Sequence, residues 1–234
     1  MSIKLMISGR RRPGQTLREH RRHMKDVHGR LVLEYISAEP HNAPRRYVQN
    51  HVIDSVFGAG DHVGTGLSLG FDFITEIWFP DLAAAKASRE TQHYLARLRP
   101  DEGRMVDDKR VIGLPFRETE VSGGAYPGAM VKVFALMPKM RDMDGNAFRA
   151  GWISVVEQAG LPETVQHIRN LALAPGSVDG IDMFRLADED AAYDFAEAYI
   201  ASVLRPMQAA GLMEADAAAI LIAREFVLHP GRQA

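Results

Sequence analysis

Hydrophobic and polar positions alternate in several short segments of the chain, which is the pattern of half-buried β-strands. In the first half of the sequence the pattern predicts strands at about 3–8, 47–56, 71–79 and 109–120. Two longer segments carry hydrophobic residues at helical spacing, one after Thr16 and one from Leu82 to about Leu98. Thr16 and Glu19 form a capping-box pattern at the start of the first helix. The predicted order is strand, helix, strand, strand, helix, strand.

The second half of the chain repeats this order. Its strands are predicted at about 131–136, 164–173, 181–186 and 219–228, and its helices at about 145–159 and 188–204. Lys4 corresponds to Lys132 at an offset of 132 − 4 = 128, and Arg117 to Arg224 at an offset of 224 − 117 = 107. The first copy is therefore longer by 128 − 107 = 21 residues, and much of the excess falls in the glycine-rich segment 57–70.

The repeated βαββαβ order is that of ferredoxin-like domains. We therefore predict an α+β fold of two tandem ferredoxin-like domains, at about 1–121 and 129–234, joined by a turn-rich linker. One face of each antiparallel sheet is covered by two helices, and the other face must be buried against something. The two open faces are expected to pack against each other as an α/β barrel with a central cavity. In the alternative arrangement, the open faces pair with a second chain in a homodimer.

Composition narrows the functional classes. The 28 basic and 30 acidic residues give a net charge of −2, which argues against a nucleic-acid partner. The chain has no cysteine, so disulfides, thiolate metal sites and a cysteine nucleophile are excluded. No apolar run approaches the ~18 residues of a membrane span, and the N-terminal segment lacks the features of a signal peptide. We therefore expect a cytoplasmic protein with no membrane partner.

Three segments of the first copy carry a family resemblance. The first helix reads Leu17-x-x-His20-x-x-x-Met24-x-x-x-His28-Gly29, and the second and third strands contain YVQNHV at 47–52 and EIWF at 76–79. These segments resemble the EthD family of the dimeric α/β-barrel superfamily. That family commonly has an aromatic residue in place of His20, Trp in place of Met24, and then His-Gly. In the second copy, Phe148 and Trp152 match this pattern, and Val156 replaces the histidine.

The resemblance implies a cofactor-independent enzyme. Family members act as lyases, dehydratases or cyclases on aromatic polyketides, or accompany oxidative degradation pathways. We therefore expect a proton-transfer lyase, dehydratase, cyclase or isomerase that takes a small aromatic or polyketide-like substrate and needs no cofactor. The alternative is a non-catalytic binding or accessory protein of an oxidative pathway. A second alternative is haem binding through a histidine, as in other branches of the superfamily.

Three residues of the first copy are the candidate catalytic groups. His28 shares a helix face with Leu17, His20 and Met24, and histidine is the usual group for proton transfer near neutral pH. Strand alternation puts Tyr47, Gln49 and His51 on one face, which is too polar for a helix-packed core and suits a wet cavity. We predict that His28, Tyr47 and His51 form one catalytic site. The alternative for His28, and the favoured interpretation for His20, is a buried histidine bonded to a backbone carbonyl.

Four further residues are candidate substrate-binding groups. They are a recurring lysine, a strand amide, a carboxylate and a tryptophan: Lys4, Gln49, Glu76 and Trp78. A salt bridge within the core is the alternative for Lys4 and Glu76. The spacing of His20, His23 and His28 is not that of a metal-binding helix, and His23 falls away from the hydrophobic face, so no metal site is predicted.

The two copies differ at the candidate positions. Aligning Val48-Gln49 with Val165-Gln166 sets Tyr47 against Thr164 and His51 against Ile168. With His28 aligned to Val156, three titratable residues of the first copy correspond to residues of the second copy that have no acid–base capacity. We therefore predict that the first copy carries the site. Divergence after duplication is the alternative, and a shift of one residue would bring His167 opposite His51.

Overall fold

The computed structural model describes residues 2–57, 70–123, 131–214 and 218–231. They form two compact units. Unit 1 comprises Met1–His51, Phe71–Arg117 and Glu225–Ala234, and unit 2 comprises Val52–Gly70 and Glu118–Arg224. Most of the glycine-rich insertion and of the linker lies outside the described residues. The domain boundaries 1–121 and 129–234 stay a prediction.

The elements of the first copy follow the predicted order. They are β1 (Ile3–Arg11), a long helix made of α1 (Leu17–Arg22), η1 (His23–His28) and α2 (Gly29–Ala38), β2 (Arg46–Phe57), β3 (Phe73–Phe79), α3 (Leu82–Ser88), η3 (Tyr94–Leu98), α4 (Arg99–Met105) and β4 (Val106–Gly123). Thr16 and Glu19 form the predicted capping box. The segments η1 and η3 are π-helical turns within longer helices.

The second copy has the same order. It contains β5 (Val131–Met137), α5 (Gly145–Gln158), β6 (Gln166–Ala172), β7 (Gly180–Leu186), α6 (Glu189–Tyr199), η4 (Ile200–Leu204), α7 (Arg205–Ala209) and β8 (Ala219–His229). Its first helix is α-helical throughout, whereas its second contains the π-helical turn η4. The π-turn η1 in the first helix of the first copy therefore has no counterpart in α5, whereas η3 and η4 lie in corresponding helices of the two copies.

The sheets are antiparallel. In unit 1, β1 is central and pairs with β3 and β4, with Lys4 opposite both Trp78 and Phe116. In unit 2, β5 pairs with β7 and β8 in the same way. The hydrogen-bonded strand order is β1-β3-β2-β8-β5-β7-β6-β4, which closes as a barrel. The predicted α+β class with antiparallel sheets is therefore confirmed. The expectation that two open sheet faces meet around a central cavity stays a prediction.

The strand registers align the two copies and correct one part of the sequence comparison. Tyr47 lies opposite Ile77 on β3, as His167 lies opposite Phe184 on β7. The offset in the second strand is thus 167 − 47 = 120 and not 117. A side-chain contact agrees with it, because Asn50 Nδ2 donates to Ile74 O at 3.0 Å and its counterpart 120 residues later repeats the bond at 3.1 Å.

Tyr47 therefore corresponds to His167, and His51 to Leu171. The expected contrast with Thr164 and Ile168 is wrong, and the second copy does have a titratable side chain in this strand. The sequence comparison is off by 120 − 117 = 3 residues because it rested on the dipeptide Val-Gln, which is too short to fix a register, and a shift by an odd number also exchanges the two faces of the strand.

The second helices of the two copies share a motif that the sequence comparison did not use. Leu98-Arg99-Pro100 of the first copy recurs as Leu204-Arg205-Pro206, at an offset of 106, and each motif begins at the last residue of a π-turn. The residue after the motif is Asp101 in the first copy and Met207 in the second.

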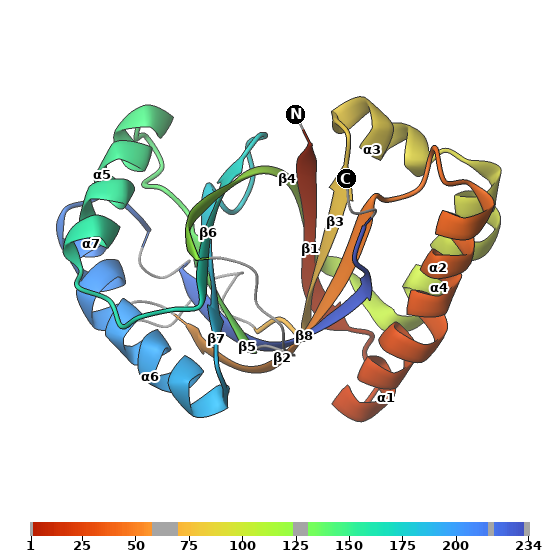
Figure 1. Cartoon of the computed structure of the whole chain (residues 1–234), viewed down its shortest axis with the longest axis horizontal. Helices are drawn as coiled ribbons and strands as arrows, with labels where there is room; N and C mark the ends of the chain where they lie inside the picture. The colour runs from red at the N-terminus through yellow and green to blue at the C-terminus, as the bar shows by residue number, and fades with distance from the viewer. Residues whose placement is uncertain (1, 58–69, 124–130, 215–217, 232–234) are drawn as a thin grey trace. The chain divides into compact units, whose positions relative to one another are not determined.

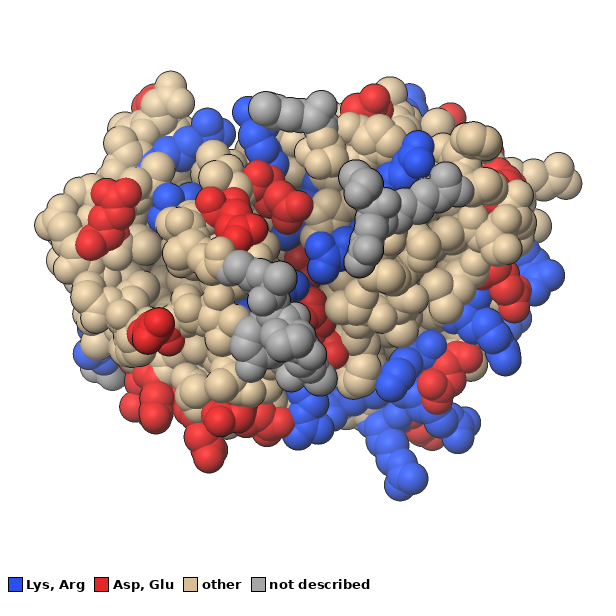
Figure 2. Space-filling view, in the orientation of Figure 1, with Lys and Arg blue, Asp and Glu red and all other residues tan. Residues whose placement is uncertain are grey.

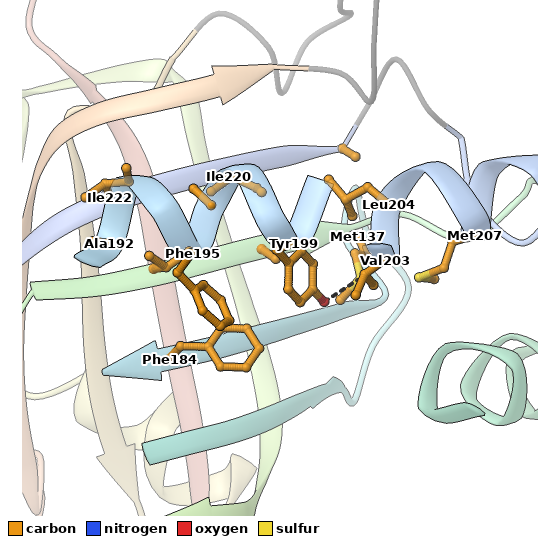
Figure 3. Packing of buried hydrophobic residues seen from close by; sticks show 14 of the residues in the cluster. Met137, Phe184, Ala192, Phe195, Tyr199, Val203, Leu204, Met207, Ile220 and Ile222 are labelled. Carbon is orange, nitrogen blue, oxygen red and sulfur yellow. Dashed lines mark hydrogen bonds between the residues drawn. The ribbon is translucent and has the colours of Figure 1, made fainter. Parts of the chain in front are cut away.

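Each unit packs its helices on one face of its own sheet. In unit 1 the helices α1, α2 and α4 lie along the sheet formed by β1 and β3 (Figure 1). In unit 2 aromatic rings fill the space between sheet and helices, and Phe184 packs against Phe195 and Tyr199 with ring centroids 4.5 and 5.4 Å apart (Figure 3).

The surface of unit 1 is basic near α1. Figure 2 shows Lys and Arg side chains gathered there, and Arg18, Arg22 and Lys25 are exposed. Among the described residues, no helix is both long and apolar enough to cross a membrane.

Candidate active site

Unit 1 contains a cavity between its sheet and its helices. The cavity measures about 410 Å³ and is lined by residues of β1, β3 and β4 on one side and of the helices on the other. Its walls are largely hydrophobic, with contributions from Ile7, Val32, Phe73, Ile77 and Leu98. The polar and charged groups on the walls are His28, Tyr35, Tyr47, Thr75, Ser88, Arg89, Tyr94, Glu102 and Asp108. A largely apolar pocket of this size with a few polar groups is typical of small-molecule sites.

The side chain of His28 lines the cavity and is hydrogen-bonded to the carboxylate of Asp101. Its Nδ1 lies 3.1 Å from Asp101 Oδ2, and the second oxygen of Asp101 lies 2.9 Å from Nε2 of His23. Burial would raise the pKa of Asp101, but the hydrogen bonds from His28 and His23 hold that pKa below its ordinary value. An ionised carboxylate only accepts hydrogen bonds, so His28 donates its Nδ1–H to Asp101 and keeps Nε2 for a ligand.

The local backbone explains how His28 comes to this position. The N–H of Gly29 bonds to the carbonyl of Met24, five residues earlier, which is the π-helical pattern. Gly29 also lets the helix approach the sheet, because a Cβ on it would come within 2.7 Å of Leu228 Cδ1. The His-Gly pair thus combines a polar side chain at the cavity with a close approach of helix and strand.

Tyr47, Gln49 and His51 are connected to one another. Gln49 Nε2 donates to the Tyr47 hydroxyl at 2.7 Å and to Met24 O at 2.7 Å, while Gln49 Oε1 lies 3.3 Å from His51 Nε2. This strand face is turned to the helices, which corrects the expectation that it is too polar for a helix-packed core. The Met24 carbonyl accepts the Gln49 amide in addition to the N–H of Gly29, so the helix itself supplies a hydrogen-bond partner for the polar strand face.

Tyr47 and His51 differ in their relation to the cavity. Tyr47 lines it and is buried, and burial raises the pKa of its hydroxyl well above the usual value, so it stays protonated. In the hydrogen bonds of the described residues, this hydroxyl appears only as an acceptor, so its proton is available to a ligand. His51 does not line the cavity, and burial together with Arg21 lowers its pKa to about 4. The structure thus brings His28 and Tyr47 to one cavity but not His51.

Of the four predicted substrate-binding residues, none lines this cavity. Gln49 contacts the site indirectly, because it donates a hydrogen bond to the hydroxyl of Tyr47, which does line the cavity. Lys4 and Glu76 lie on the opposite face of the sheet, where Lys4 Nζ is 3.0 Å from Glu76 Oε2 and 4.9 Å from the centroid of the Trp78 ring. The salt bridge that was the alternative for Lys4 and Glu76 is therefore present. Their role in substrate binding stays a prediction that this cavity does not support.

His20 has the structural role that was favoured for it. Its Nδ1 lies 3.0 Å from the carbonyl oxygen of Met105, and its ring packs on Phe73. Burial lowers its pKa, so it is a neutral core residue.

Several residues of the site were not predicted from the sequence. Asp101, Tyr94 and Glu102 come from the second helix, and the Tyr94 hydroxyl donates to Glu102 Oε1 at 2.7 Å. Burial and the Glu102 charge raise the pKa of Tyr94 to about 12. The signal that could have found Asp101 is the repeated Leu-Arg-Pro motif, because a carboxylate follows it in one copy and a methionine in the other.

The corresponding space in unit 2 is filled. Register and helix offsets place Phe184 at the position of Ile77, Phe195 at that of Ser88 and Trp152 at that of Met24. Asp182 there accepts hydrogen bonds from Trp152 Nε1 and the Tyr199 hydroxyl at 2.8 Å each, and lies 2.6 Å from His167. The larger side chains and this buried network replace a cavity with a packed core.

Comparisons with known proteins agree with this fold. Residues 12–109 match the family model described as the EthD domain, so an EthD domain occupies most of the first copy. No curated protein matches the chain.

Two solved structures share the fold across nearly the whole chain. An anthrone oxidase-like protein is 12% identical, with 97% of this chain and 93% of that chain covered and a TM-score of 0.54. A chlorite dismutase from Candidatus Nitrospira defluvii in complex with imidazole is 11% identical, with 97% and 92% covered and a TM-score of 0.55. At these identities the likeness concerns the fold.

Proposed function

We propose that the cavity of unit 1 binds a small, planar, largely apolar molecule and that His28 transfers a proton on it. The observation that carries this proposal is the position of His28 on the cavity wall, with its Nδ1 3.1 Å from the buried carboxylate of Asp101. A carboxylate behind a histidine fixes the tautomer and stabilises the imidazolium that forms when the other nitrogen accepts a proton. The EthD domain in residues 12–109 supports an enzymatic or ligand-binding role for this copy.

The proposed reaction is a proton transfer at a carbon next to a carbonyl group. His28 Nε2 removes the proton, and the electron pair of the C–H bond moves to the carbonyl oxygen as an enolate. Tyr47 donates its hydroxyl hydrogen bond to that oxygen, which stabilises the developing charge. Return of the proton from His28 to another carbon of the enolate system gives an isomerisation. Attack of the enolate carbon on a second carbonyl of the same molecule, whose oxygen then takes the proton from His28, gives a cyclisation. Departure of a leaving group from the neighbouring carbon, protonated by His28 as it leaves, gives a lyase or dehydratase reaction. No cofactor takes part in these steps.

Exchange of a carbon-bound proton tests the proposal without knowledge of the natural substrate. Anthrone is a suitable probe, since it is planar, aromatic and carries a methylene group activated by a carbonyl. The loss of its methylene signal is followed by NMR in D2O under argon with wild-type protein, His28→Gln, Tyr47→Phe and, as a control in the second copy, Val156→Ala. We expect His28→Gln to slow the protein-dependent exchange by about 100-fold or more, with the melting temperature retained.

The same experiment separates the enzyme from a non-catalytic binding protein. The largely hydrophobic lining of the cavity favours this second candidate. A binding protein would raise its melting temperature with anthrone yet leave the exchange rate at that of buffer. Equal exchange by wild type and His28→Gln would contradict the proposed role of His28. Loss of exchange in Val156→Ala would show that the site lies in the second copy.

Haem binding is a third candidate, favoured by the His28–Asp101 pair. Axial histidines of haem commonly donate their second nitrogen to a carboxylate, and His28 is the imidazole on this cavity wall. These residues fit one axial ligand, and a bound haem would supply redox chemistry at its iron. A visible spectrum of the protein after addition of haemin decides this, because a shifted Soret band that His28→Ala abolishes would favour haem over cofactor-free proton transfer.

A further inference from the structure

Asp101 is shared by two histidines, and only one of them lines the cavity. His28 contacts Oδ2 and lines the cavity, while His23 contacts Oδ1 and its side chain is 22% exposed, against 10% for His28. Asp101 itself is 4% exposed. Both carboxylate oxygens are thus held, one by a residue at the proposed site and one by a residue at its outer edge.

The π-turn is what allows this arrangement. In a regular α-helix, a residue five positions on lies about 140° around the helix axis, so His23 and His28 would point to different sides. The sequence-based prediction placed His23 away from the hydrophobic face for this reason. In η1, which begins at His23 and ends at His28, the i to i+5 bond pattern puts these two residues one turn apart on one side.

The second copy supplies an internal comparison. At the offset of 128, Gly151 stands in place of His23, and valines occupy both 155 and 156, the positions that match His28 with or without the extra residue of the π-turn. Met207 stands in place of Asp101. The helix of the second copy has no π-turn, although the π-turn of the other helix occurs in both copies. The two histidines, the carboxylate and the π-turn are therefore present together or replaced together.

We propose that His23 is a positioning residue which, through Asp101, fixes the orientation and tautomer of His28; this inference rests on the proposed function of His28. The Nε2–H of His23 holds Oδ1, so the carboxylate cannot rotate away and Oδ2 stays directed at His28 Nδ1. His28 then keeps its proton on Nδ1 and presents an unprotonated Nε2 to the cavity. Without His23, the freed oxygen would bind water and the carboxylate would sample rotamers in which it no longer holds His28.

Two variants of His23 separate positioning from a merely structural role. His23→Ala removes the hydrogen bond to Asp101, whereas His23→Gln keeps an N–H donor of similar reach. His41 is an exposed histidine, and His41→Ala serves as the matched control. In the anthrone exchange assay, we expect His23→Ala to lower kcat about 10-fold with KM nearly unchanged, and His23→Gln to recover most of the loss.

A spectroscopic measurement tests the same inference without turnover. In 15N-histidine-labelled protein at alkaline pH, the nitrogen shifts of neutral His28 report which ring nitrogen carries the proton. We expect the Nδ1–H form in the wild type, in His23→Gln and in His41→Ala, and a mixture of both tautomers in His23→Ala. A His28 tautomer unchanged by His23→Ala would overturn the inference, as would a fall in kcat that His23→Gln does not rescue. If no variant exchanges anthrone, the proposed function fails while the tautomer measurement still decides the role of His23.

Discussion

Acid unfolding reports directly on His51. This side chain is 4% exposed, and burial, strengthened by the positive charge of Arg21, lowers its pKa from 6.5 to about 4. In the unfolded chain its pKa returns to the ordinary value. Between these pH values the unfolded state binds a proton that the folded state excludes, so the free energy of unfolding falls as the pH drops from 6.5 towards 4. At 1.36 kcal/mol per pH unit, the loss across this interval is about 3 kcal/mol.

The matched variant is His51→Leu, because Leu171 occupies the corresponding register position in the second copy. Urea denaturation of both proteins is measured at several pH values between about 7.5 and 4.5, and the difference in free energy isolates His51 from the other histidines. We expect the wild type to lose about 2 to 3 kcal/mol more than the variant over this range. Parallel pH profiles would refute the reasoning, because they would mean that folded His51 takes up a proton as readily as the unfolded chain.

Three further predictions concern the cavity and its walls. Ser88→Phe introduces the aromatic ring that the second copy has at this position and fills the cavity. We expect it to abolish the thermal shift with anthrone while the free energy of unfolding changes by less than about 1.5 kcal/mol, and an unchanged thermal shift would mean that anthrone binds elsewhere. Asp101→Met is expected to cost about 3 kcal/mol in urea denaturation, and the double variant with His28→Val to recover at least about 1 kcal/mol of it; simple additivity would argue against coupling of the pair. Gly29→Ala is expected to destabilise by about 1 to 3 kcal/mol because its Cβ would come within 2.7 Å of Leu228 Cδ1, and wild-type stability would show that the helix can move away.

The elements of both copies could be predicted because their signals are local. The capping box at Thr16 and the run of aromatic and β-branched residues in β3 are signals within short segments, and the helix start and the strand that they predict are both observed. The offset of 107 at Arg117 and Arg224 also agrees with the strand registers. Lys4 pairs with Phe116 as Lys132 pairs with Ala223, and 223 − 116 = 107. Local periodicity was therefore sufficient for the order of the elements and for most of the repeat.

The site required information that periodicity does not contain. His28 and Tyr47 were identified, but their partner Asp101 lies 73 residues from His28 on another helix, and only packing brings it to the histidine. The side to which Tyr47 points depends on which sheet face the helices cover, and strand alternation leaves that choice open. His23 was misplaced because the helical period was taken as 3.6 residues, whereas η1 is π-helical.

Lys4 and Glu76 show a different limit. A salt bridge within the core was one of the two interpretations of these residues, and the structure pairs them at 3.0 Å. The residue types alone did not tell whether they face the helices or the other side of the sheet. A buried ion pair and a ligand-binding pair have the same sequence signature, so only the position of the cavity distinguishes them.

The structure of the protein with anthrone bound shows whether the cavity of unit 1 holds the ligand between His28 and Tyr47. A crystal structure of the complex, collected with wild-type protein and with Ser88→Phe, locates the ligand without any assumption about turnover. We expect density for the ring system between β3 and η3, with the carbonyl oxygen within hydrogen-bond distance of the Tyr47 hydroxyl and the methylene carbon next to His28 Nε2, and no such density in Ser88→Phe. Density for anthrone outside this cavity, or in contact with neither His28 nor Tyr47, would show that these residues do not form the binding site.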